Sequence, residues 1–199
     1  MNKSFTIVDK KKTKIINSQD YFIIALILSV GLIFINHKLL QFKEIENILF
    51  YVFILSFTAY IGRIIFSFSE TESINGNKSG KLKFFKDKII IKDREFLLKS
   101  IKKIDFHVFE YEGEFNTIQM DSVEPKYKNG SNNFMELNLN NGENLKIYFI
   151  QTYQDEFLKI SDELIEYHKN GLFSFLKLIQ FLKIEDYDKI QEFKKTKLI

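Results

Sequence analysis

The sequence predicts a pair of membrane-spanning helices followed by a polar domain of the α+β class. Two apolar runs, residues 21–36 and 45–68, stand close together near the start of the chain. Runs of this kind suit a lipid bilayer, because a helix satisfies its own backbone hydrogen bonds where no water is present. Period-two alternation then dominates up to about residue 151, and a helical period follows it.

Composition narrows the functional classes. The chain has 199 residues, no Cys and a formal net charge of +3 at pH 7. The lack of Cys excludes disulfides, thiolate metal sites and Cys nucleophiles, and so small a charge does not favour a nucleic acid polymer as partner. The sequence has no phosphate-binding loop, nucleophile elbow or metal-ligand spacing. We therefore predict a non-enzymatic protein without catalytic residues, metal or cofactor.

The first apolar run allows two other readings. A cleaved signal peptide also places basic residues before an apolar stretch, but no small-x-small cleavage site follows this run. As a helix, residues 21–36 span about 24 Å, which is short of a ~30 Å hydrocarbon core and leaves a buried core helix as an alternative. Extension of the helix to about residue 40 closes this gap.

Lysine residues flank the two runs on their outer sides. Five lie within residues 3–14 and five more within residues 78–88. Cationic flanks stay on the cytoplasmic side of a membrane. Abundant Lys, Ile, Asn and Phe is typical of an AT-rich bacterial genome. We therefore expect a multi-pass protein of the bacterial inner membrane, with both termini in the cytoplasm and a short outer connector.

Two residues near the end of the second run are candidates for helix–helix contacts. Arg63 either extends its guanidinium to lipid phosphate at the interface or is a polar group within the helix bundle that sets helix–helix pairing or a pore. Gly62, with Thr58 and Ala59 one turn earlier, offers a small surface for close helix approach. We predict Gly62 and Arg63 as membrane or oligomerisation residues, and a homo-oligomer as the assembly.

Alternation predicts most strands of the polar domain. They cover residues 81–86, 88–92, 95–98, 101–112, 133–140 and 144–151, with a further short strand at 116–120. Asn141-Gly142 favours a type I′ turn between the last two long strands, because both turn positions need positive φ. The expected parts are a cytoplasmic basic tail (1–20), two transmembrane helices with a connector (21–68), a linker (69–80), a β-rich domain with its closing helix (81–170) and a C-terminal helical extension (171–199).

The helical period begins near residue 153. Residues 153–169 predict an amphipathic helix, which Asn170-Gly171 ends as a C-cap pair. In residues 172–184, nine of thirteen side chains are apolar, and the polar ones do not share one face. This segment either packs inside the domain or lies on the membrane or on a partner. Residues 186–195 predict a short charged helix.

Six or so antiparallel strands closed by a helix are similar in outline to a pleckstrin-homology-like (PH-like) domain. The run GKLKFFKDKIIIKDREFLLKSIKKIDFHVFEYEGE resembles the opening of bacterial PH-like domains, with Ser100, Ile101 and Ile104 where the chain crosses to the next strand. The wider pattern resembles uncharacterised two-span membrane proteins of Bacteroidetes at Tyr111, Gly113, Gly130, Asn132, Asn133, Tyr187, Ile190 and Gln191. The resemblance implies an antiparallel β-barrel or sandwich, closed by an amphipathic helix, that binds a partner, a lipid headgroup or a small ligand.

The layout also resembles the two-transmembrane β-barrel effectors of bacterial cyclic-oligonucleotide anti-phage signalling. That resemblance implies a barrel that binds a cyclic nucleotide and helices that oligomerise to disrupt the inner membrane. Lysines in the strands suit phosphate groups or an anionic lipid surface, and Tyr rings offer stacking for a base; the alternative is a solvated strand face. The candidate ligand-binding residues are Lys83, Lys88, Lys92, Lys102, Lys103, Tyr111, Tyr127 and Lys128. A core filled by Phe and Ile favours the PH-like reading, whereas a polar, basic cavity favours the effector.

Overall fold

A computed structural model describes residues 3–11, 18–117 and 123–198 of the chain. The chain divides into two compact units. The helical unit comprises residues 12–72 and 115–127, and the sheet unit comprises residues 1–11, 73–114 and 128–199.

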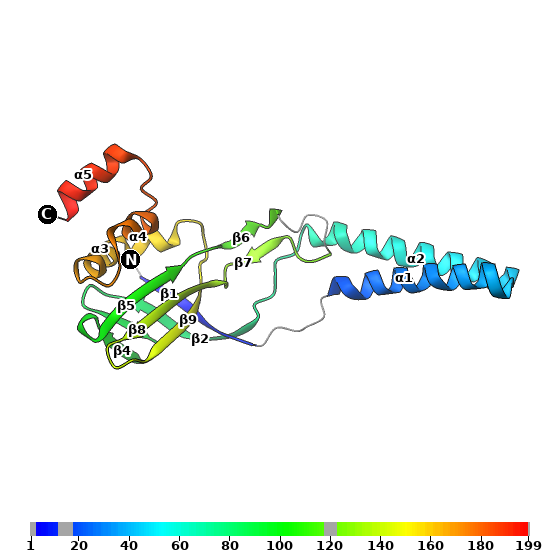
Figure 1. Cartoon of the computed structure of the whole chain (residues 1–199), viewed down its shortest axis with the longest axis horizontal. Helices are drawn as coiled ribbons and strands as arrows, with labels where there is room; N and C mark the ends of the chain where they lie inside the picture. The colour runs from blue at the N-terminus through cyan, green and yellow to red at the C-terminus, as the bar shows by residue number, and fades with distance from the viewer. Residues whose placement is uncertain (1–2, 12–17, 118–122, 199) are drawn as a thin grey trace. The chain divides into compact units, whose positions relative to one another are not determined.

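Two long helices dominate the helical unit (Figure 1). Helix α1 (Ser18–Ile35) continues into a π-helical turn, η1 (Asn36–Leu40), and α2 (Lys43–Ser67) follows it. The segments Tyr21–Leu39 and Lys43–Ser67 have mean hydropathies of 2.1 and 2.0. Both are long and apolar enough to cross a membrane, so the predicted pair of apolar helices is confirmed, as is the extension of the first to about residue 40.

Large apolar side chains on these helices face outward. Ile27 is 65% exposed and Leu55 is 72% exposed. Apolar surface of this extent is costly in water and is typical of a membrane or protein contact. The turn between the helices is held by Asn36, whose Nδ2 donates to the carbonyl of Phe42 at 3.0 Å, and by Gln41, which adopts a left-handed φ of 56°.

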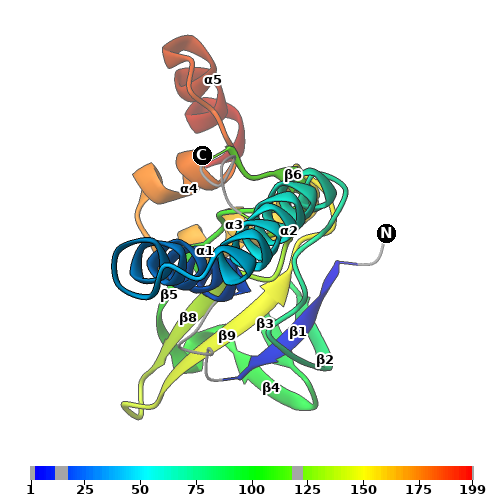
Figure 2. The same ribbon diagram turned by 90° about the vertical axis from the view of Figure 1, so that its right-hand side faces the viewer.

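An antiparallel sheet of seven strands, in the order β4-β3-β2-β1-β9-β8-β5, forms the main layer of the sheet unit (Figures 1 and 2). Its strands are β1 (Ser4–Lys10), β2 (Gly76–Phe84), β3 (Lys88–Ile91), β4 (Arg94–Leu97), β5 (Ile101–His107), β8 (Asn133–Leu139) and β9 (Asn144–Ile150). A separate two-stranded sheet consists of β6 (Glu112–Phe115) and β7 (Tyr127–Asn129).

Strand β1 corrects the predicted basic tail over residues 1–20. It lies fourth in the sheet, antiparallel to both β2 and β9. Phe5 and Ile7 alternate toward the core and are only 3% and 2% exposed, so the segment has the period that a half-buried strand requires. The prediction is therefore wrong for Ser4–Lys10. Since β1 precedes α1 and β2 follows α2, the two helices are an insertion between paired strands.

The sheet curls but does not close into the predicted barrel. Its edge strands β4 and β5 are joined by a 3₁₀ turn, η2 (Leu98–Ser100), and do not pair with each other. At the free edge of β5, the N–H of Ile104 instead donates to the carbonyl of Leu172 at 3.1 Å. Arg94 and Glu143 form an ion pair at 3.2 Å, which ties the β3–β4 turn to the β8–β9 turn. The predicted antiparallel sheet followed by helices is confirmed, whereas its closure into a barrel is wrong.

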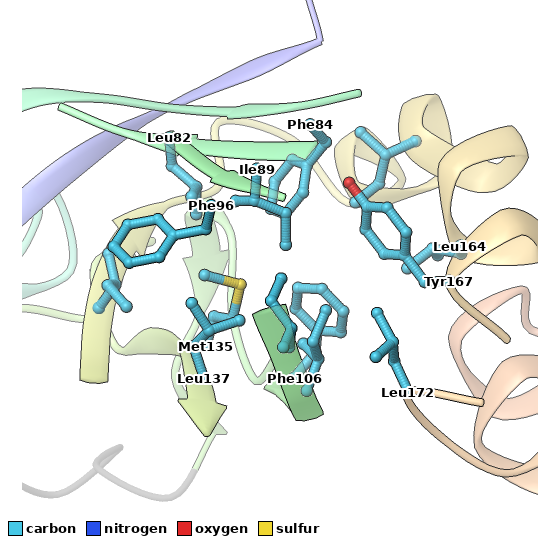
Figure 3. Close-up of a cluster of buried hydrophobic side chains, with 14 of the residues drawn as sticks. Leu82, Phe84, Ile89, Phe96, Phe106, Met135, Leu137, Leu164, Tyr167 and Leu172 are labelled. Atoms are coloured by element: carbon cyan, nitrogen blue, oxygen red, sulfur yellow. The ribbon is translucent and has the colours of Figure 1, made fainter. Parts of the chain in front are cut away.

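Helices cover the core side of the sheet. They are a 3₁₀ turn η4 (Glu156–Ile160), α3 (Ser161–Lys169) and α4 (Phe175–Phe181), while α5 (Tyr187–Lys197) follows them in the chain and has no buried residue. Strand side chains and residues of the helical layer point toward one another in a common apolar cluster (Figure 3). Leu178 of α4 is fully buried in this cluster, while Leu176 is 79% exposed. The segment 172–184 thus packs inside the unit in this structure.

Several element boundaries differ from the prediction. β2 begins inside the predicted linker 69–80, β5 ends at His107, and the predicted strand 116–120 extends outside the described residues. The β8–β9 hairpin is confirmed, but its turn is not type I′. Gly142 has a φ of 88°, whereas Asn141 is not in the positive-φ region. The N–H of Leu139 bonds to the carbonyl of Glu143, so the loop has three residues, as in a hairpin with a glycine bulge.

Candidate functional site

The structure does not gather the predicted ligand-binding lysines into one site. Lys83 is exposed on β2. Lys102 and Lys103 are both exposed because a β-bulge interrupts the register between Ile101 and Lys103, and they line a shallow groove of about 440 Å³ with Asn138.

Three other predicted lysines are neutralised locally by carboxylates of the sheet unit. The pairs are Lys88–Glu95 at 2.9 Å, Lys92–Asp9 at 2.9 Å and Lys128–Glu114 at 3.3 Å. A ligand phosphate would compete with these carboxylates for the same ammonium groups. A shared role for the lysines in ligand binding stays a prediction.

The two predicted stacking residues belong to different units. Tyr127 lies in the helical unit, where its N–H donates to the carbonyl of Glu70 and its carbonyl accepts from the N–H of Glu72. Its ring meets that of Phe115 edge-on, with 5.6 Å between the centroids. Tyr111 is half-buried and lines a cavity in the sheet unit.

Arg63 and Gly62 have different surroundings within the helical unit. The Nη1 atom of Arg63 lies 2.7 Å from Oε2 of Glu70, which follows the end of α2. The pair neutralises the guanidinium close to the helix end, in accord with an interfacial position. A Cβ added to Gly62 would meet no atom within 4 Å, so the structure makes no close helix contact at this glycine. A role for either residue in oligomerisation stays a prediction.

A cavity of about 400 Å³ opens beside the end of β5, and we call it the acidic cavity. Its apolar wall includes Phe106, Phe157 and Phe181, whose rings contact one another at centroid distances of 5.1 to 6.2 Å. Its charged lining residues are Glu110, Glu114, Asp155 and Lys183.

The loop that carries Glu110 is held by the amide of Asn133, which is fully buried. Its Nδ2 donates to the carbonyls of Glu110 and Gly130, each at 2.8 Å. Its Oδ1 accepts from the N–H groups of Phe109 at 2.7 Å and Glu110 at 3.0 Å. One side chain thus satisfies four backbone groups, and this fixes the wall of the acidic cavity.

Two buried polar residues, Glu110 and Gln151, line the acidic cavity. Glu110 is 6% exposed and accepts from the backbone N–H and the Nδ2 of Asn132, both at 3.0 Å. Gln151 is 2% exposed, and its Nε2 donates to the carbonyls of Tyr153 and Gln154. The Oε1 of Gln151 is buried and accepts no hydrogen bond in the described part of the chain.

A second concave surface, which we call the basic groove, has a volume of about 640 Å³ and involves β1, β3, β4 and β9. The hydrogen bond from the Lys92 ammonium lowers the pKa of the Asp9 carboxyl, so these two charges offset each other. The groove also has aromatic surface from Phe96 and Tyr148. Its charged lining residues are Asp9, Lys10, Lys92, Asp93, Arg94 and Lys146.

Aromatic rings form a row across β5, β8 and β9. His107 stacks on Phe134 at 4.3 Å between centroids, and Phe134 meets Tyr148 at 5.5 Å. The Lys146 ammonium lies 3.6 Å from the centroid of Phe134. Each neighbouring pair of rings is in direct register across the strands, which makes the row a source of sheet stability.

Among the residues that line the acidic cavity, sequence reasoning singled out Tyr111, as a stacking residue for a base, and missed Glu110 and Gln151. The Asn132-Asn133 pair was a usable signal, because buried amides often hold irregular loops. Burial of the two acceptors is set by packing between distant segments, which one sequence does not display.

Comparison of the chain with protein-family models, curated proteins and solved structures finds no match. The PH-like resemblance and the resemblance to anti-phage effectors therefore stay predictions. Function has to be inferred from the geometry of the two units.

Proposed function

We propose that the chain is a membrane-anchored, non-enzymatic binding module whose sheet unit takes up a ligand or partner at the cytoplasmic face of a bacterial inner membrane. The observation that carries this proposal is the insertion of two exposed apolar helices between the paired strands β1 and β2. An antiparallel strand pair keeps its ends together, so a chain that leaves from β1 has to return to β2 on the same side of the membrane. Two spans meet this requirement.

The packing of the sheet unit supports ligand binding at its surface and argues against a binding chamber inside it. The cluster between sheet and helices consists of apolar side chains such as Leu82, Phe84 and Ile104, each 1% exposed or less. A cyclic oligonucleotide inside the unit would have to displace them. Ligands are therefore expected at the surface cavities.

We include a PH-like fold in the proposal. The curled antiparallel sheet and the helix α3 packed on its core support it. This chain differs from the simple arrangement of antiparallel strands closed by a helix, because two helices are inserted between its first two strands.

The anchor is tested by fractionation of cells that express the full chain. Leu55 lies at the centre of α2, and Leu55→Arg costs about 3–4 kcal/mol for insertion of a membrane helix. Wild-type protein is expected in the membrane pellet after alkaline carbonate extraction, whereas a larger share of the Leu55→Arg variant is expected in the supernatant, because α1 remains as the one intact apolar helix. Leu176→Arg on α4 is the matched control, because Leu176 is similarly exposed and lies in the sheet unit. Wild-type protein in the supernatant would overturn the proposal.

The orientation has its own test, which uses the lack of native Cys. In intact cells, a membrane-impermeant maleimide is expected to label Lys38→Cys in the connector and to spare Asn141→Cys in the β8–β9 turn. The reverse pattern would place the sheet unit outside the cytoplasm.

One observation favours the alternative function, an anti-phage effector. The basic groove carries four cationic side chains against two carboxylates and includes aromatic surface, which together suit an anionic nucleotide. Thermal-shift measurements on the full chain in detergent, with cyclic dinucleotides and trinucleotides, test it. A stabilisation that Arg94→Glu removes would support the effector, and a lack of stabilisation by every nucleotide would reject it.

A further inference from the structure

We propose that the acidic cavity binds a small organic cation, an ammonium or guanidinium group on an apolar body. The inference rests on the proposed function as a binding module and names the ligand class of one of its sites. A volume of about 400 Å³ lies within the range of small-molecule sites.

The first argument is the unsatisfied acceptor of Gln151. The Nε2 of this amide donates to two backbone carbonyls, Tyr153 at 2.9 Å and Gln154 at 2.7 Å. These two acceptors fix which end of the amide is the nitrogen, because a flipped amide would set oxygen against oxygen. The Oε1 atom is therefore a buried acceptor that lacks a donor, on a residue that lines the cavity. Such an atom costs free energy as long as it lacks a donor, so this wall of the cavity favours a ligand that brings donors over one that brings acceptors.

The second argument is the charge of the lining. Glu110, Glu114 and Asp155 provide three carboxylates, while Lys183 provides one ammonium and is already 2.8 Å from Asp155. Lys128 offsets Glu114 from outside the cavity. Glu110 accepts from uncharged amide donors and forms no ion pair among the described residues. A buried carboxylate in this state is a natural counterion for a cationic ligand.

The third argument is the aromatic surface. Phe106, Phe157 and Phe181 offer apolar contact for the body of the ligand, and ring faces also attract organic cations. The combination of one unsatisfied acceptor, net negative charge and an aromatic wall disfavours phosphates and carboxylates. The acidic cavity and the basic groove thus favour ligands of opposite charge.

Single-cysteine labelling measures which sign of charge the cavity prefers, and it does so with simple reagents in place of the natural ligand. Gln180 is exposed and lines the acidic cavity, whereas Leu176 lies on the same helix and does not line it. Full-length Gln180→Cys and Leu176→Cys proteins in detergent are treated with two methanethiosulfonates, one carrying a trimethylammonium and the other a sulfonate. The ratio of the two rates cancels differences in thiol ionisation between sites.

The cationic reagent is expected to be favoured at Gln180→Cys by about tenfold relative to the ratio at Leu176→Cys. Addition of Asp155→Asn is expected to lower that preference. Millimolar 2-phenylethylammonium is expected to slow labelling at Gln180→Cys, and neutral 2-phenylethanol is not. Equal ratios at the two sites, or a lack of protection by the ammonium, would overturn the proposal.

Failure of this inference is separable from failure of the proposed function. Both cysteine variants are purified from the membrane pellet, so a chain without a membrane anchor fails before labelling begins. Variants that enter the membrane but show no charge preference would reject the cation site and leave the anchored module in place.

Discussion

Asn133 is the side chain on which the wall of the acidic cavity depends, and Asn133→Asp is the sharpest test of that role. The change keeps the shape of the side chain and replaces its two N–H donors by an acceptor oxygen. The carbonyls of Glu110 and Gly130 then lose their bonds at 2.8 Å and face a carboxylate. Each buried acceptor left without a donor costs about 1–3 kcal/mol, so the variant should lose ~2–6 kcal/mol in its free energy of unfolding. That is a large fraction of a domain's typical stability of about 5–15 kcal/mol.

The loss should depend on pH with a defined sign. The ionised carboxylate is disfavoured beside two carbonyl oxygens, so its pKa in the folded variant is raised above the unfolded value of about 3.9. A group with a raised folded pKa contributes its stability below the unfolded pKa and loses it as the pH rises. The Asn133→Asp variant should therefore be closest to wild type near pH 4 and fall behind as the pH increases toward 7.

Hydrogen exchange read by mass spectrometry is the suitable assay, because the chain lacks Trp. Faster exchange is expected in peptides that cover residues 106–112 than in wild type, while peptides from β2 and β3 keep their protection. Asn138→Asp is the control, since Asn138 lies on the same strand and makes no described side-chain hydrogen bond. Equal protection of residues 106–112 in Asn133→Asp and wild type at pH 7 would refute the assigned role.

Two further predictions concern buried groups of the sheet unit. Burial raises the pKa of Tyr167 above its ordinary value, and its hydroxyl donates to the carbonyl of Phe85 at 2.8 Å. The unfolded phenol ionises near pH 10, so this group should lower the free energy of unfolding by ~1.4 kcal/mol per pH unit above about pH 10. Tyr167→Phe should remove this contribution, which is measured as a smaller decline of the urea midpoint between about pH 9 and 11. Gly130 has a φ of 69°, and an added Cβ would lie 2.2 Å from the carbonyl oxygen of Gln151. Gly130→Ala should therefore be far more destabilising in thermal unfolding than Gly142→Ala, which meets open space and should cost about 1–2 kcal/mol of left-handed strain.

The parts of the fold that sequence patterns predicted are those with local signals. The two apolar helices follow from runs that no soluble strand or loop would need, and the β8–β9 hairpin follows from clean alternation on either side of Gly142. In each case the segment and its partner are close in sequence. The pattern therefore reports the structure directly.

The parts that were missed depend on distant segments. Phe5 and Ile7 alternate as strand residues do, but their partners in β2 and β9 lie more than 70 and 140 residues away. A short run of this kind beside several lysines is equally typical of a basic tail. Closure of the sheet was misjudged for a related reason, because the donor at Ile104 is taken by Leu172 of a later segment.

In the candidate site, too, the sequence predicted local features and missed those that depend on distant segments. Counting lysines in strands indicated a basic binding face, yet side chains such as Lys88 and Lys92 meet carboxylates that the linear pattern does not pair with them. Glu110 and Gln151 read as ordinary polar residues in the sequence. Their burial, and the unsatisfied oxygen of Gln151, exist only once β5, β9 and the loop that follows are packed together.

The insertion of the helices between β1 and β2 couples the formation of the helix pair to the folding of the sheet. Pairing of β1 with β2 brings Lys10 beside Gly76, which closes a loop of residues 11–75. For a flexible loop of that length the length-dependent closure cost is about 3.7 kcal/mol. This cost falls when the formed helices α1 and α2 shorten the part of the loop that has to be closed. A formed helix pair would therefore favour the pairing of β1 with β2. The paired β1 and β2 would in turn hold the start of α1 and the end of α2 together. An apolar helix pair attached to one end of a folded domain would give neither effect, so the position of these helices makes the sheet unit thermodynamically sensitive to whether α1 and α2 are formed and paired.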